Sequence, residues 1–264
     1  MLSYIKKVVK RIAGEQIYQK FQQFLHRCRS RIRQWRIPPI GVLFFSNIMK
    51  SRNLKILGMA QGTDKHDADH SFTGVSYLDV YEQYLLPHQD EKIALMEIGV
   101  KDGASLRMWK SFFPRADIFG IDIDPRCKTL EQERIRIATG SQDDEQFLAG
   151  CFGERPRFHV IIDDGSHINR MTLASFQYLF HHRLHSGGLY IIEDLRCSYD
   201  KLQTQFDVRK NWPGMRYNDP AVSLDNDRKD MDDFFLKILF DLDHRKGEIQ
   251  FIHFWSNMCV IKKV

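Results

Sequence analysis

Two carboxylates and one imidazole follow a short apolar segment near the middle of the chain. In the segment 159–162, the three residues after His159 are apolar and β-branched, and Asp163, Asp164, Gly165, Ser166 and His167 come directly after them. An apolar run that ends in acidic residues and glycine is typical of a buried parallel strand that turns into an active-site loop. Metal binding and proton transfer are the chemistry that these residue types allow.

A second apolar run, residues 188–192, ends at Glu193 and Asp194. Two neighbouring strands would therefore present four carboxylates and a histidine at one edge of a sheet. Carboxylates that lie close together raise one another's pKa unless a cation neutralises them, and oxygen-rich clusters suit magnesium, calcium or manganese. The pattern predicts a divalent cation at this edge.

Both segments belong to a regular alternation of strands and helices. Further apolar runs lie at residues 93–98, 118–121 and 135–137, and segments of helical spacing separate them. Such alternation predicts an α/β fold with a doubly wound, mostly parallel sheet. The last two strands, residues 249–254 and 258–261, are expected to form an antiparallel hairpin.

The 264 residues, 43% of them hydrophobic, fit one such domain with an appendage. Residues 1–40 hold ten lysines and arginines against the single acid Glu15, which leaves 29 basic and 33 acidic residues for the remainder. We therefore expect a basic amphipathic helical arm over residues 1–50 and a catalytic domain over residues 51–264. The acidic domain lacks a basic, aromatic groove, which argues against a nucleic-acid partner.

Two interpretations of the arm stay open. It either caps the body as packed helices, or residues 1–36 contact an anionic membrane surface. The five cysteines show no paired spacing, no apolar run approaches the roughly 20 residues that span a bilayer, and the first residues do not form a secretory signal. We expect a cytoplasmic protein, peripheral at the inner face of the membrane if the arm binds lipid.

A glycine-containing turn after the first strand is the natural place for a nucleotide-type ligand. The segment Glu97 to Ser105 lacks the spacing of a dinucleotide site, and Glu97 would repel a pyrophosphate. S-adenosylmethionine carries cationic groups and no phosphate, so it suits the turn better. A plain connection between strand and helix is the alternative.

Two later segments could complete a cofactor site. Asp122 ends the second strand and is placed to accept hydrogen bonds from ribose hydroxyls. Gln142, after the third strand, could contact the adenine, although residues 140–143 also fit an ordinary helix N-terminus.

Taken together, these motifs resemble a known family. Gly62 to Lys65, Glu97 to Val100, Trp109, Gly120 to Asp124, Gly140 to Gln142, Ile161 to His167 and Glu193 to Leu195 are similar to the metal-dependent S-adenosylmethionine O-methyltransferases of macrolide sugars, of the mycinamicin VI 2''-O-methyltransferase type. The resemblance covers roughly residues 58–200 and, more weakly, the hairpin, but not the arm. It implies the seven-stranded, doubly wound sheet of a Rossmann-like class I methyltransferase.

The resemblance implies a role for each site residue. Mg²⁺, or another hard divalent cation, would be held by Asp164, Glu193 and Asp194, and the catalytic residues would be His167, as general base, and Asp164. The cofactor-binding residues would be Thr63, Lys65, Glu97, Gly99, Ser105, Asp122, Gln142 and Asp163, the last at the methionine end.

The function that follows is methyl transfer from S-adenosylmethionine to a sugar hydroxyl on a glycoside, glycolipid or polysaccharide. A sugar hydroxyl must lose its proton, and a Lewis acid with a nearby imidazole would assist that loss. The alternatives are a catechol-type O-methyltransferase and a non-catalytic cofactor-binding member of the fold. The arm is not part of the family's motif and favours a membrane-linked acceptor. A homo-oligomer, and a lid formed by residues 196–230, are also left open.

Overall fold

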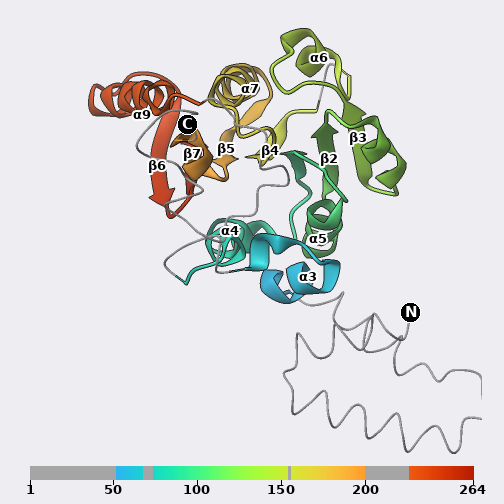
Figure 1. Cartoon of the computed structure of the whole chain (residues 1–264). Coiled ribbons are helices and arrows are strands. Elements are labelled where there is room, and N and C mark those ends of the chain that lie inside the picture. The colour runs from blue at the N-terminus through green and yellow to red at the C-terminus, as the bar shows by residue number, and fades with distance from the viewer. Residues whose placement is uncertain (1–51, 68–73, 154–155, 200–225) are drawn as a thin grey trace, which may run out of the picture.

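The computed structural model describes residues 52–67, 74–153, 156–199 and 226–264. Within them, seven strands form one sheet in the order β3-β2-β1-β4-β5-β7-β6 (Figure 1). The strands are β1 (Ala94–Ile98), β2 (Asp117–Asp122), β3 (Ile135–Thr139), β4 (Phe158–Asp163), β5 (Leu184–Ile192), β6 (Ile249–Trp255) and β7 (Met258–Lys263). The first five run parallel, and β7 is antiparallel to both β5 and β6. The predicted doubly wound sheet and C-terminal hairpin are therefore confirmed.

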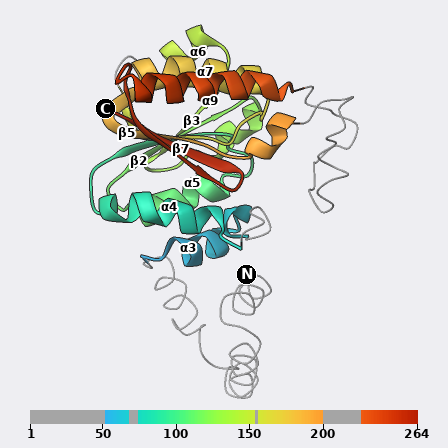
Figure 2. The ribbon, with the colours of Figure 1, turned by 90° about the vertical axis from the view of Figure 1, so that its left-hand side faces the viewer.

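Helices cover both faces of the sheet (Figure 2). One face carries α3 (Leu54–Gln61), α4 (Tyr77–Leu85) and α5 (Ala104–Phe112), and the other carries α6 (Glu145–Gly150), α7 (Asn169–His182) and α9 (Arg228–Asp243). Short 3-10 turns lie at η1 (Asp64–His66), η3 (Leu86–His88), η4 (Pro125–Leu130) and η5 (Leu195–Tyr199). Two apolar clusters, one on each side of the sheet, form the core.

Local sequence signals explain where the helices near the site begin and end. Ser76 caps α4 and exchanges hydrogen bonds with Asp79, which is a capping box. The side chain of Asn53 caps α3, and Gly62 ends that helix in the left-handed conformation. The left-handed Gly62 therefore leads the chain from α3 into η1, the turn that carries Lys65.

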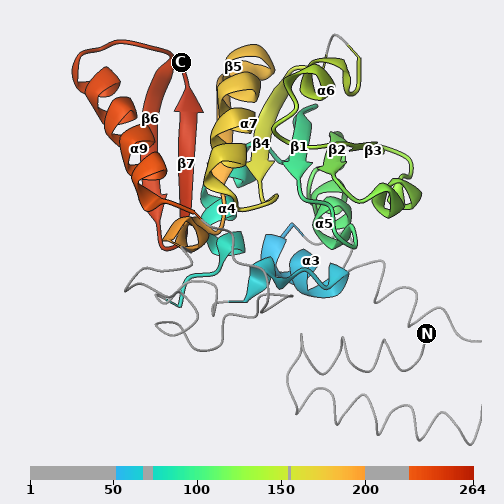
Figure 3. The same ribbon diagram turned by 45° about the horizontal axis from the view of Figure 1, so that its top comes forward.

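The pairing of the central strands decides which residues meet at the carboxyl edge. Ile98 of β1 pairs with Asp163 of β4, and Asp163 pairs with Ile192 of β5. These strands lie side by side in Figure 3. The residues that follow each strand must therefore emerge next to one another, which brings the glycine turn and both acidic segments together.

Two predicted segments fall wholly or partly outside the described residues. The basic arm, with its proposed membrane contact and its boundary at residue 50, lies outside them, as does most of the predicted lid, residues 200–225. Among the helices that the structure describes, none is both long and apolar enough to cross a bilayer.

Candidate functional site

The turn after β1 and the loop after β4 touch through their backbones. Gly99 has a φ of +95°, and a Cβ atom placed on it would lie 2.0 Å from the backbone oxygen of Asp164. The Asp164 amide in turn donates a hydrogen bond to the Ile98 carbonyl at 3.0 Å. Only glycine allows this approach, so Gly99 sets the distance between the predicted cofactor turn and the predicted metal loop.

Substituting Gly99→Ala should therefore lower the free energy of unfolding by about 2–5 kcal/mol, because a strained φ and an overpacked contact add. Gly62→Ala is a matched control, since Gly62 has a φ of +84° but nothing within 4 Å of its Cβ position. It should lose only about 1–2 kcal/mol. Denaturant unfolding compares the two variants. Equal losses would mean that the contact with Asp164 is unimportant.

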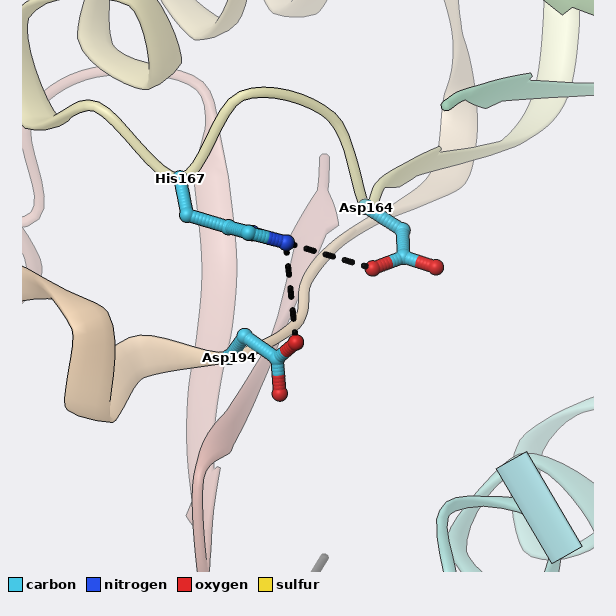
Figure 4. Close-up of side chains that lie close together, drawn as sticks. All are labelled: Asp164, His167 and Asp194. Atoms are coloured by element: carbon cyan, nitrogen blue, oxygen red, sulfur yellow. Dashed lines mark ion pairs between the residues drawn. The ribbon is translucent and has the colours of Figure 1, made fainter. Parts of the chain in front are cut away.

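Asp164, His167 and Asp194 converge at the carboxyl edge (Figure 4). His167 Nε2 lies 3.9 Å from Asp164 Oδ1 and 3.6 Å from Asp194 Oδ2, and about a quarter of each side chain is exposed. One ligand atom from each residue lies within 4.8 Å of the others. Carboxylate oxygens that are accessible and face a common point fit a hard divalent cation.

Neighbouring side chains hold Asp194 and His167 in place. Asp194 Oδ1 accepts hydrogen bonds from the Tyr77 hydroxyl at 2.7 Å and from Asn257 Nδ2 at 2.8 Å. Asn226 Nδ2 donates to the His167 carbonyl at 2.8 Å. His167 and Asp194 both adopt left-handed backbone conformations, with φ of 56°. Such strained residues persist where the surroundings fix them, and they gather at functional sites.

Glu193 lies beside this group but is almost fully buried. Its Oε2 accepts a hydrogen bond from Lys65 Nζ at 2.6 Å, and its Oε1 accepts one from the Tyr81 hydroxyl. Burial raises the pKa of Glu193, with repulsion from Asp164 and Glu97 in the same direction, while Lys65 opposes the rise. The structure thus brings Asp164 and Asp194 together with His167, whereas Glu193 is buried beside them. Its predicted role as a metal ligand stays a prediction.

Lys65 and Glu97, both predicted to bind the cofactor, form an ion pair in the interior. Lys65 Nζ lies 3.3 Å from Glu97 Oε1, and the two side chains are 3% and 0% exposed. Burial alone would lower the pKa of Lys65, but attraction to Asp164, Glu193 and Glu97 holds it well above its ordinary value. Burial raises the pKa of Glu97, although hydrogen bonds from Ser105 and Trp109 oppose the rise. Glu97 Oε2 accepts the Trp109 bond at 2.8 Å.

Thr63 and Ser105, also predicted at the cofactor, are both buried. Thr63 caps the turn that carries Lys65, and its hydroxyl accepts a hydrogen bond from the Lys65 amide at 3.4 Å. Ser105 lies in the first turn of α5 beside Glu97. Both side chains are placed to shape the wall of the site, and their contact with a cofactor stays a prediction.

Asp122 holds the glycine turn. Its Oδ2 accepts hydrogen bonds from the amides of Val100 and Lys101 at 2.8 and 2.9 Å, and its Oδ1 accepts one from the Asp124 amide at 2.9 Å. The carboxylate stays half-buried at the edge of the sheet. Oδ2 already accepts two bonds, whereas Oδ1 can accept a further one, so the predicted contact with a ribose stays compatible with this geometry.

Gln142 and Asp163 belong to a buried network under the loop. Gln142 Nε2 donates to both oxygens of Asp163 at 3.2 Å, and Gln142 Oε1 accepts from the Ser166 amide at 2.7 Å. Ser175 of α7 donates to Asp163 Oδ2 at 2.8 Å. These contacts favour a structural role for both residues, in which they position the loop that carries Asp164 and His167. The predicted contacts of Gln142 with the adenine and of Asp163 with the methionine end stay predictions.

Sequence reasoning missed several residues that complete the site. Tyr77 and Tyr81 project from α4, Asn257 lies in the turn between β6 and β7, and Ser175 lies on α7. Burial and Asp194 hold the pKa of the Tyr77 hydroxyl well above its usual range, so it remains a donor. Two tyrosines at positions i and i+4 of one helix were the available signal, because a buried tyrosine hydroxyl needs a polar partner.

Comparisons with known proteins agree with this geometry. No protein-family model matches the chain. L-olivosyl-oleandolide 3-O-methyltransferase from Streptomyces antibioticus is 38% identical over 189 residues, which are 69% of this chain and 43% of that protein. Mycinamicin VI 2''-O-methyltransferase from Micromonospora griseorubida is 38% identical over 141 residues, 51% of this chain and 32% of that protein. The chain therefore spans less than half the length of these curated relatives.

A solved structure shows the same similarity in three dimensions. The MycE methyltransferase of the mycinamycin biosynthetic pathway, in complex with Mg, SAH and mycinamycin VI, superimposes with a TM-score of 0.60 at 31% identity. The match covers 80% of this chain and 54% of that one. In sequence and in fold, the chain is thus a relative of the macrolide-sugar O-methyltransferases, and the resemblance predicted from its motifs is confirmed.

Proposed function

We propose that the chain is a metal-dependent O-methyltransferase that moves a methyl group from S-adenosylmethionine to a sugar hydroxyl. The observation that carries this proposal is the convergence of Asp164, His167 and Asp194 at the carboxyl edge, directly against the Gly99 turn. In open α/β sheets, ligands bind at this edge. The relatives that share the sequence are named as O-methyltransferases, one of them of the glycosylated compound L-olivosyl-oleandolide.

In this proposal His167 takes the proton of the acceptor hydroxyl, and its position beside Asp164 and Asp194 supports that role. As the acceptor oxygen forms its bond to the methyl carbon, the bond from carbon to sulfur breaks, S-adenosylhomocysteine leaves, and the hydroxyl proton passes to His167 Nε2. Asp164 and Asp194 flank that nitrogen and would stabilise the imidazolium. A divalent cation held by Asp164 and Asp194, with Glu193 beside them, would act as a Lewis acid on the acceptor hydroxyl.

We propose that the acceptor is a sugar attached to a larger molecule. The names of the relatives favour a sugar carried by a larger natural product, and the predicted basic arm favours a sugar linked to a lipid or polysaccharide. A catechol would use the same metal chemistry. Hydrogen bonds from Tyr77 and Asn257 to Asp194 fix one side of the site.

An acceptor panel with isotope-labelled S-adenosylmethionine and Mg²⁺ tests the function. We expect label on a glycosylated macrolide or a glycolipid and none on a catechol, read by mass spectrometry of the product. Transfer to the catechol alone would replace the sugar proposal with the catechol alternative. Binding of S-adenosylmethionine without transfer to any acceptor would favour a cofactor-binding protein.

A further inference from the structure

One lysine compensates several acids in the interior of the site. Lys65 Nζ lies 2.5 Å from Asp164 Oδ2, 2.6 Å from Glu193 Oε2 and 3.3 Å from Glu97 Oε1. The three acids come from the ends of three different strands, whereas Lys65 comes from the short turn η1 before the sheet begins. The acids at the ends of β1, β4 and β5 therefore share one positive charge, the ammonium of Lys65.

The charges of this group do not balance. Glu97, Asp164 and Glu193 offer three carboxylates, and among the side chains that the structure describes, the ammonium of Lys65 is the only lysine or arginine charge that pairs with them. Glu97 and Glu193 are 0% and 2% exposed, so water screens them little. Buried carboxylates without a positive partner repel each other and destabilise the fold.

The hydrogen bonds also show which oxygens are already engaged. Both oxygens of Glu193 have a donor, one from Lys65 and one from Tyr81. Asp164 offers Oδ2 to Lys65, while its Oδ1 faces His167. A cation bound by Asp164 and Glu193 would thus share these two carboxylates with the ammonium.

We propose that Lys65 is the internal counter-ion of the acidic cluster when no metal is bound, and that its ammonium opposes divalent-cation binding at the same carboxylates. This inference rests on the metal site of the proposed function. Lys65 would stabilise the empty site and weaken the binding of the ion, so that the ion remains exchangeable. Lys65 is then a positioning residue, and its side chain needs no contact with S-adenosylmethionine.

The test compares wild-type protein with Lys65→Met, which keeps an apolar stem of similar length and removes the charge. In chelator, the variant should unfold at a lower temperature than the wild type. Added Mg²⁺ should raise its midpoint by more than it raises that of the wild type, and calorimetry should show Mg²⁺ affinity higher by on the order of tenfold. Lys110→Met, whose ammonium bonds Gln132 at the surface, is the control and should change neither quantity.

A double variant keeps the test decisive if Lys65→Met folds poorly. Adding Glu97→Gln to Lys65→Met removes one negative charge, which matches the positive charge already lost. In chelator, the double variant should therefore recover much of the unfolding temperature that Lys65→Met loses. A Lys65→Met protein that is as stable as the wild type in chelator, or that binds Mg²⁺ no more tightly, would overturn the inference. Failure of the double variant to recover stability would also overturn it. If the wild type binds no Mg²⁺, the proposed metal site is wrong, and the midpoints in chelator still decide the counter-ion role.

Discussion

Replacing Asp164 by asparagine should lower methyl transfer by at least about 10³-fold while S-adenosylmethionine binds almost as well as before. Asp164 is one of two accessible carboxylates in the converging group, and it also contacts Lys65. The amide cannot supply the anionic oxygen that a hard cation needs, but it preserves the volume and the backbone contact with Gly99. The loss should therefore fall on turnover and on metal affinity.

Labelled methyl transfer measures the turnover, and calorimetry measures the two affinities. Asp233→Asn is the control, because Asp233 forms an exposed ion pair with Lys229 on α9. It should behave as the wild type. An Asp164→Asn enzyme that keeps its rate would remove Asp164 from the metal site, and one that loses cofactor binding instead would place Asp164 in the cofactor pocket.

Substituting His167→Ala should lower the turnover rate by roughly 10²–10⁴-fold, the usual contribution of a positioned general base. Nε2 lies between Asp164 and Asp194, where it can accept the proton of an acceptor hydroxyl. Cofactor and metal affinity should change little. The residual rate should rise with pH, because hydroxide from the solvent replaces the lost base.

A surface histidine provides the matched control for this variant. His181 pairs with Glu248 at 2.6 Å at the far end of α7, and His181→Ala should leave the rate and its pH dependence unchanged. If His167→Ala loses metal affinity along with activity, His167 is a ligand of the ion and another group must take the proton. If it fails to fold, the left-handed backbone at this residue is its main contribution.

The residues at the strand ends of the site could be predicted from the sequence, because the order of the strands alone brings them together. Apolar runs identified the strands, and the ends of neighbouring parallel strands must share an edge, so Asp164 and Asp194 were expected to meet. The two residues between Asp164 and His167, Gly165 and Ser166, fit a tight turn that returns the imidazole to the same edge. Strand register and topology require no knowledge of the surrounding helices.

The contacts that sequence could not predict all join segments that are far apart. Lys65 is 99 residues from Asp164 and 128 from Glu193, and Tyr77 is 117 residues from Asp194. Lys65 lies in a polar loop without periodicity, where nothing indicates which acids it faces. Asp163 was difficult for another reason. A strand sends neighbouring side chains to opposite faces, and register alone did not tell whether Asp163 or Asp164 points into the site.

Metal dependence of the wild-type enzyme tests the central claim most directly. The full chain would be stripped with chelator, and label transfer from S-adenosylmethionine to the best acceptor would be measured before and after Mg²⁺ is added back. The geometry of Asp164, His167 and Asp194 predicts a loss of transfer in chelator that Mg²⁺ restores. Full transfer in excess chelator would contradict it and leave His167 as a base that works without a metal.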